Sequence, residues 1–179
     1  GRARAEISAT FRPGTPGNRD APMNVFGKVV VIAGALWAAA FLTDKRARVL
    51  RTAMAELGPR DPDKYWRDVQ PALVGERLAW CGGFALWVLR KAGLTDWQWV
   101  PEQGFLGRLP RTNNPQPGDI AYFSEFQHHA IVKKTDGKTL WTIDGNQAPG
   151  ESVRVRERPI TAAHSFYSIE PLVSGKAAA

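Results

Sequence analysis

The sequence has few of the residues that bind metals or form covalent crosslinks. Among its 179 residues there is one cysteine, Cys81, and there are three histidines. A single cysteine excludes an intrachain disulfide, and so small a set of cysteines and histidines does not support a zinc site. The chain also lacks a glycine-rich loop of the phosphate-binding or dinucleotide-binding type. The sequence therefore predicts an activity that uses no metal and no cofactor.

The net charge of +7 is concentrated near the N-terminus. Residues 1–60 hold ten Lys and Arg against four Asp and Glu, whereas residues 61–179 hold fourteen against thirteen. Residues 1–22 combine basic residues with prolines, which predicts a mobile basic arm. Such an arm is either a solvated leader or a contact for nucleic acid, anionic wall polymer or lipid headgroups. The rest of the chain is nearly neutral, and for the protein as a whole we expect no nucleic-acid partner.

A run of fourteen apolar or small residues follows at 29–42. Because a membrane span needs about twenty such residues, this run is a signal-peptide core, an anchor or a buried helix, and its length does not decide. Residues 47–57 then carry apolar side chains at helical spacing. We expect residues 1–57 to form the basic arm and an apolar helical extension, and residues 58–179 to form a separate domain.

Cys81 lies where an apolar helix is expected to begin, in the sequence WCGGFALWVL. The N-terminus of a helix offers unpaired N–H groups and a partial positive charge, and both favour a thiolate over a thiol. A lone cysteine is also commonly a small buried core residue. A lone cysteine is more often a core residue than a nucleophile, but the residues downstream of Cys81 favour the nucleophile.

The second half of the chain has the pattern of an antiparallel sheet. Runs rich in β-branched and aromatic residues, bounded by turn residues, predict strands at 118–123, 128–132, 139–147, 152–156 and 166–170. Asp136 and Gly137 form a hairpin signal, so the strands on either side of them should pair antiparallel. The sequence thus predicts an α+β fold in which about five antiparallel strands pack beside the Cys81 helix.

This pairing places His128 and His129 on one strand and Asp144 and Asn146 on its neighbour. A cysteine attacks an acyl carbon as thiolate, so a histidine must take its proton, and a third polar residue must orient that histidine. The two histidines face opposite sides of their strand, and parity alone does not say which is the base. Asp144 and Asn146 share one face, so the third residue also has two candidates.

Four motifs follow one another along the chain: WCGGF at 80–84, PGDIA at 117–121, QHHAIV at 127–132 and DGN at 144–146. In this order and spacing, they resemble cysteine peptidoglycan hydrolases of the NlpC and CHAP type, small members of the papain-like class. The resemblance covers roughly residues 60–160, and Gln127 stands where the family often has glycine. The resemblance implies that Cys81 is the nucleophile, that His128 is the base, and that Asp144 and Asn146 hold the imidazole. The backbone N–H of Cys81 is the candidate oxyanion donor.

The resemblance also implies a substrate. It is the peptidoglycan stem peptide, cleaved at the muramoyl-alanine amide or within the peptide. We expect a secreted, periplasmic or cell-envelope protein, with membrane contact through residues 29–42 if that run is an anchor. A secreted lysin and an antibacterial effector both fit, and an effector would require a cognate immunity protein. The alternatives are a non-catalytic wall-binding or interaction module and an acyltransferase on the same fold.

Three further features lie near this site in the sequence. Residues 58–75 are polar and proline-rich, which predicts a linker and a leading turn. Trp99 and neighbouring aromatic residues fall in a loop that is a candidate wall of the substrate groove. Arg154 and Arg156 alternate with valines, so they should project from the exposed face of their strand, as solvated charges or as anion ligands.

Overall fold

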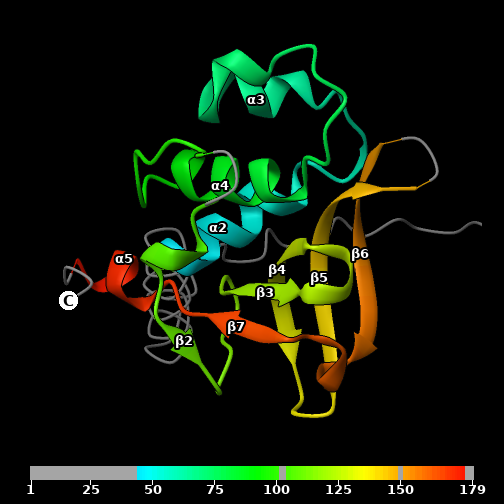
Figure 1. Ribbon diagram of the computed structural model, residues 1–179. Helices are drawn as coiled ribbons and strands as arrows, with labels where there is room; N and C mark the ends of the chain where they lie inside the picture. Colours follow the sequence, from blue (N-terminus) through cyan, green and yellow to red (C-terminus); the bar gives the residue numbers. More distant parts are fainter. Residues whose placement is uncertain (1–43, 101–103, 149–150, 176–179) are drawn as a thin grey trace, which may run out of the picture. The chain divides into compact units, whose positions relative to one another are not determined.

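The computed structural model describes residues 44–100, 104–148 and 151–175 (Figure 1). All of them belong to one unit of the chain, residues 38–179. The predicted basic arm and the apolar run at 29–42 lie outside the described residues. Within the described ranges, no helix is both long enough and apolar enough to cross a membrane.

Four α-helices are present in this part of the chain. Of these, α4 and α2 pack against the sheet, and α3 packs against α4. Helix α4 occupies the centre, because it packs against α2, α3 and strands β4 and β5 (Figure 1). The helices are α2 (Lys45–Met54), α3 (Asp63–Val69), α4 (Cys81–Lys91) and α5 (Glu170–Ser174). Short 3₁₀ turns occupy Pro71–Leu73, Leu106–Arg108, Ser124–Phe126 and Ile160–Ala162.

The sheet is antiparallel throughout, which confirms the predicted α+β class. Its spatial order is β1-β6-β5-β4-β3-β7-β2. The strands are β1 (Gly58–Pro59), β2 (Arg111–Thr112), β3 (Ile120–Phe123), β4 (His128–Thr135), β5 (Thr139–Gln147), β6 (Ser152–Pro159) and β7 (Ser165–Tyr167). The five predicted strands are all present, but the predicted strand number is wrong because the described residues form seven. The two extra strands, β1 and β2, lie at the edges and have two residues each, too few to show an alternating pattern.

The predicted linker at 58–75 is also wrong in part, because it contains α3. Pro62 precedes this helix, where its fixed φ is compatible with the first turn. Tyr65, Trp66 and Val69 are buried on one side of α3 and join the main core. The two aromatic residues therefore pack in the interior.

Helix α2 confirms the helix expected at residues 47–57. Asp44 caps it by accepting a hydrogen bond from the N–H of Arg46. Val49 and Ala53 are fully buried in the same hydrophobic cluster as α4. Part of the predicted N-terminal extension therefore contributes to the core of residues 58–175.

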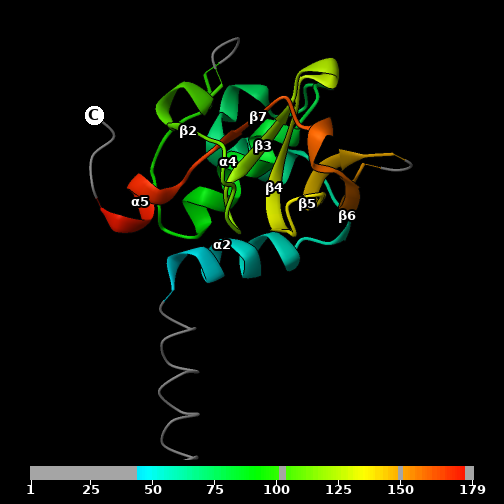
Figure 2. The same cartoon turned by 90° about the horizontal axis from the view of Figure 1, so that it is seen from below.

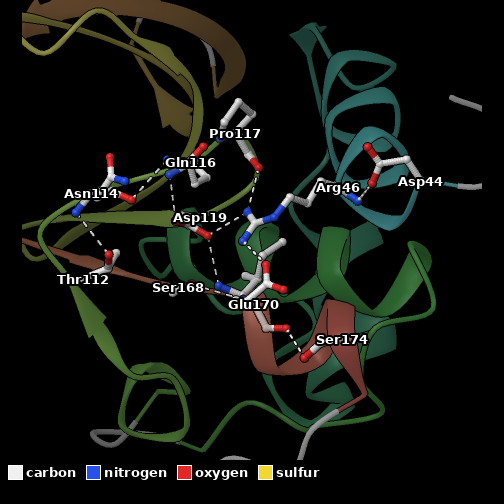
Figure 3. Close-up of polar contacts among 11 residues, drawn as sticks. Asp44, Arg46, Thr112, Asn114, Gln116, Pro117, Asp119, Ser168, Glu170 and Ser174 are labelled. Carbon is white, nitrogen blue, oxygen red and sulfur yellow. Dashed lines mark hydrogen bonds and ion pairs between the residues drawn. The ribbon is translucent and has the colours of Figure 1, made fainter.

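Asp119, in the Pro-Gly-Asp motif, joins α2 to two other segments (Figure 3). Its Oδ1 accepts from Nη1 of Arg46 at 2.9 Å and from the N–H of Ile169 at 3.0 Å. Its Oδ2 accepts from the N–H of Gln116 at 2.8 Å. The second guanidinium nitrogen of Arg46 donates to Glu170, at the start of α5. This buried carboxylate thus fixes α2 (cyan in Figure 2), the segment leading into β3 and the segment leading into α5.

The sheet has a different core on each face. Alternate residues such as Ile131 and Ile143 pack under α4 in the main cluster. The residues between them, including Ala130 and Val132, belong to a smaller cluster on the opposite face. Because successive strand residues alternate in direction, His129 lies on the α4 face and His128 on the opposite face.

Candidate active site

Cys81 is the first residue of α4 and is 5% exposed. The first intrahelical bond runs from the N–H of Phe84 to the carbonyl of Trp80, so the N–H groups of the first turn have no acceptor within the helix. At the next residue, Gly82, a Cβ would collide with the ring of Trp99. Glycine is therefore needed here for the helix start to approach this loop.

The residue before the two histidines shapes the backbone next to the thiol. Gln127 has φ 48° and ψ 38°, the left-handed conformation that favours glycine. Its carbonyl oxygen lies 4.0 Å from Sγ of Cys81. This conformation reverses the chain between the 3₁₀ turn Ser124–Phe126 and β4. It gives a physical reason for the glycine common at this position in the family that the sequence resembles.

His128 is held by a buried carboxylate. Its Nε2 lies 2.8 Å from Oδ2 of Asp144, and the side chains are 13% and 0% exposed. The register accounts for this contact, because Asp144 pairs with Ala130, the neighbour of His128 on the same face of β4. With Nε2 bonded to Asp144, Nδ1 is the ring nitrogen left to interact with Cys81.

His129 has a different environment on the other side of β4. Its Nδ1 lies 4.0 Å from Sγ of Cys81. The ring is surrounded by Tyr122, Phe105 and Trp99, with centroid distances of 5.2, 5.9 and 5.9 Å. No carboxylate of the described residues contacts it. Both histidines thus approach the thiol, but among the described residues only His128 has a carboxylate bonded to its ring.

The site favours separated charges on Cys81 and His128. Burial raises the pKa of the Cys81 thiol, but interactions with His128 and His129 outweigh it and lower this pKa to about 6. Burial lowers the pKa of His128, but hydrogen bonding to Asp144 and to Cys81 raises it to about 9. Near neutral pH the pair is therefore a thiolate and an imidazolium, the form in which cysteine is nucleophilic.

Asp144 is itself held by two further side chains. Nη2 of Arg158 donates to its Oδ2 at 2.8 Å, and the hydroxyl of Thr142 donates to its Oδ1. Burial raises the pKa of Asp144, but the bond from His128 and the charge of Arg158 overcome this effect and lower the pKa. The guanidinium of Arg158 also lies 4.4 Å from the centroid of the Phe123 ring. Asp144 is therefore a carboxylate at neutral pH.

Sequence reasoning missed Arg158 because the predicted strand ended at residue 156. The observed β6 continues to Pro159. Extending the alternation of Arg154 and Arg156 by two residues would have placed Arg158 on the same face.

Asn146 lies beside the site without contacting the imidazole of His128 through a hydrogen bond. It has φ 57° and follows Asp144 where the pairing of β5 with β6 is irregular. It lines a cavity that also contains Cys81 and His128. Of the two candidates for the third residue, Asp144 is the one bonded to the ring.

Two cavities meet at Cys81. The first, which we term the charged cavity, has a volume of about 520 Å³ and is lined by Ala79, Cys81, Phe123, Glu125, Phe126, His128, Asn146, Gln147, Arg156, Arg158 and Ala162. The second, the aromatic cavity, has about 490 Å³ and is lined by Ala79, Cys81, Gly82, Trp99, Gly104, Leu106, Tyr122, Phe126, Gln127, His129 and Tyr167. Each contains one of the two histidines. Trp99, which the sequence placed in a candidate wall of the groove, lines the second cavity.

Acidic, histidine and cysteine side chains are the usual protein ligands of metal ions. Within the described ranges, no three of them come together in a group that could hold a metal ion.

Comparison with known protein families finds a similarity over part of the chain. The family model of the CHAP domain matches residues 74–146, a segment that contains Cys81, His128, Asp144 and Asn146. This match confirms the resemblance seen in the sequence motifs. No curated protein and no solved structure matches the chain.

Proposed function

From the CHAP domain at residues 74–146, we propose that this protein is a cysteine amidase or endopeptidase that cleaves an amide bond of the peptidoglycan stem peptide. The CHAP family supplies the substrate class, since its members are generally hydrolases of peptidoglycan. The observation that carries the mechanism is the arrangement of Cys81, His128 and Asp144. A thiolate at a helix N-terminus, an imidazolium beside it and a buried carboxylate on that imidazolium are the parts that acyl transfer needs.

In the first half of the proposed reaction, Sγ of Cys81 attacks the carbonyl carbon of the scissile amide. The oxygen gains negative charge, and in this proposal the backbone N–H of Cys81, at the start of α4, donates to it. His128 then transfers its proton to the amide nitrogen, and the C–N bond breaks. The amine leaves, and the acyl group stays on the sulfur as a thioester.

In the second half, His128 is neutral and acts as a base. It takes a proton from a water molecule, whose oxygen attacks the thioester carbon. The C–S bond breaks, the carboxylic acid is released, and the thiolate–imidazolium pair is restored. Asp144 stays ionised throughout and orients the ring of His128.

The CHAP match also supports a papain-like arrangement of this core and a site of action at the cell envelope, where peptidoglycan is found. We propose both. The helix that begins at Cys81 and the antiparallel sheet that carries His128 and Asp144 are consistent with the first.

Release of muropeptides from purified peptidoglycan tests the function. We expect the wild type to release fragments whose masses identify the bond cut. Cys81→Ala and His128→Ala should reduce the rate by at least about 10³-fold. His129→Phe provides a matched control, because it removes the other histidine next to the thiol and keeps an aromatic ring. We expect it to lose far less activity than His128→Ala.

A different result would change the assignment. If a folded wild type released nothing, the protein would be a wall-binding module or an acyltransferase instead. If His129→Phe lost activity while His128→Ala kept it, the base would be His129.

The pH dependence of kcat/KM provides an independent test. Ionisation of Cys81 should give a rise near pH 6, and deprotonation of His128 should give a fall near pH 9. The two groups interact, so these limbs belong to the pair rather than to either residue alone. A profile that rises only near pH 9 would contradict the thiolate–imidazolium pair.

A further inference from the structure

The two cavities that meet at Cys81 differ in charge. The charged cavity contains Arg156, Arg158 and Glu125 besides the reacting groups. Among the described residues that line the aromatic cavity, there is no Lys, Arg, Asp or Glu. Phe126, which is 74% exposed, lines both cavities. A substrate that crosses Cys81 therefore meets a charged environment on one side and an aromatic one on the other.

The two arginines of the charged cavity have different roles. Arg158 donates to Asp144 and Thr142 and is 19% exposed, so its guanidinium is engaged within the protein. Arg156 is exposed, and its side chain has no ion pair or hydrogen bond with any residue that the structure describes. Glu125 lines the same cavity but forms no ion pair with Arg156. The guanidinium of Arg156 is therefore available to an anion that enters the cavity.

The proton transfer decides which part of the substrate enters this cavity. His128 gives its proton to the amide nitrogen, so the leaving amine must lie on the side of Cys81 that His128 occupies. His128 lines the charged cavity and not the aromatic one. The portion of the peptide that follows the scissile amide thus extends toward Arg156, and the acyl portion extends toward Trp99 and Tyr122.

We propose that Arg156 binds a carboxylate on the leaving peptide and so selects substrates that are anionic after the scissile amide. This inference rests on the proposed function, because it uses the direction of the amide cleavage. A guanidinium binds a carboxylate through two parallel hydrogen bonds, and charge-assisted bonds of this kind are stronger than neutral ones. Amidation of that carboxylate removes the negative charge and one acceptor.

A binding experiment tests this assignment without requiring turnover. Two synthetic stem peptides are compared, one with a free carboxylate on the leaving side and one with the same group amidated. Their affinities for the full-length Cys81→Ala variant are measured by titration calorimetry. We expect the acid to bind about tenfold more tightly than the amide, and the difference to shrink at high salt.

The preference should disappear in Cys81→Ala combined with Arg156→Gln. The matched control is Arg154→Gln, which removes the same charge from the same strand but from a residue that does not line either cavity. It should keep the preference. With active enzyme, Arg156→Gln should raise KM for the acid peptide about tenfold and leave kcat within about twofold.

Equal affinity for acid and amide, no affinity for either peptide, or an unchanged preference in Arg156→Gln would overturn the inference. These outcomes are separate from those for the proposed function. Hydrolysis by the wild type with no acid preference would retain the hydrolase and remove the role of Arg156. Binding with acid preference but no hydrolysis would retain the anion site and remove the enzyme.

Discussion

Two buried aspartates, Asp119 and Asp144, each bind an arginine from another segment, yet their remaining partners differ. Asp119 accepts from Arg46 and from two backbone N–H groups, those of Gln116 and Ile169 (Figure 3). The positions of these backbone donors are set by the course of the main chain. Asp119 therefore fixes where three segments lie with respect to one another.

Asp144 accepts only from side chains in the contacts that the structure describes. They come from His128, Thr142 and Arg158. These side-chain donors do not constrain the main chain. Together with Asp144 they fix the position of the imidazole ring of His128. A buried aspartate bonded to an arginine is therefore not in itself a catalytic feature. What distinguishes the two sites is a titratable partner that also faces a nucleophile.

The largest effect that this comparison predicts is on the rate of the Asp144→Asn variant. The amide has nearly the same shape as the carboxylate but cannot stabilise an imidazolium, and it permits the wrong ring tautomer. We expect kcat to fall by about 10³-fold in the muropeptide assay. The pH range of activity should also narrow, because the pKa of His128, and with it the alkaline limb, would fall without the carboxylate. A kcat within about threefold of the wild type would show that Asp144 is structural, like Asp119.

Asp119→Asn should change stability instead of chemistry. The amide nitrogen would face either the guanidinium of Arg46 or a backbone N–H, and a buried polar contact would be lost. Breaking a buried charge pair on one side typically costs 3–5 kcal/mol, and we expect about 3 kcal/mol because Arg46 retains 17% exposure. Urea unfolding measures this loss, and kcat per folded molecule should stay within about twofold. A large fall in kcat with unchanged unfolding would reverse the roles of the two aspartates.

The sequence predicts the two sites unequally. The contact between His128 and Asp144 follows from strand parity and a hairpin signal, which are local, so it could be foreseen as one of a few alternatives. The choice of Asp144 over Asn146 could not be foreseen, because it depends on an irregularity in the pairing of β5 with β6. The Asp119 motif was visible, but its partner Arg46 lies 73 positions away in the sequence. No local pattern joins residues at that distance.

A matched pair of arginine variants separates the roles of the two aspartates. Arg158 and Arg46 are 19% and 17% exposed and each binds one of the aspartates. We expect Arg158→Gln to lower kcat about tenfold, because the carboxylate that orients His128 loses a charged donor. Loss of this nearby cation also favours the imidazolium, so the alkaline limb of the pH profile should move upward.

Arg46→Gln should leave both kcat and the pH profile unchanged while lowering the free energy of unfolding. The shift in the alkaline limb is the decisive reading, since a purely structural loss would not move it. Equal effects of the two variants on the pH profile would show that Arg158 acts through stability alone.

The smallest predicted effect concerns Thr142, whose hydroxyl donates to Asp144 and accepts from Arg158 at 3.3 Å. Thr142→Val keeps the shape of this fully buried side chain and removes only the hydroxyl. Because His128 and Arg158 continue to hold Asp144, we expect kcat to fall only about threefold and the free energy of unfolding by about 1 kcal/mol. Both kcat and the free energy of unfolding are measured on one preparation, so that the two losses can be compared directly. A loss of stability without any change in kcat would place Thr142 with the donors of Asp119, whose contribution is to the fold. A fall in kcat that approaches the effect of Asp144→Asn would mean that this hydroxyl, rather than Arg158, controls the orientation of the carboxylate.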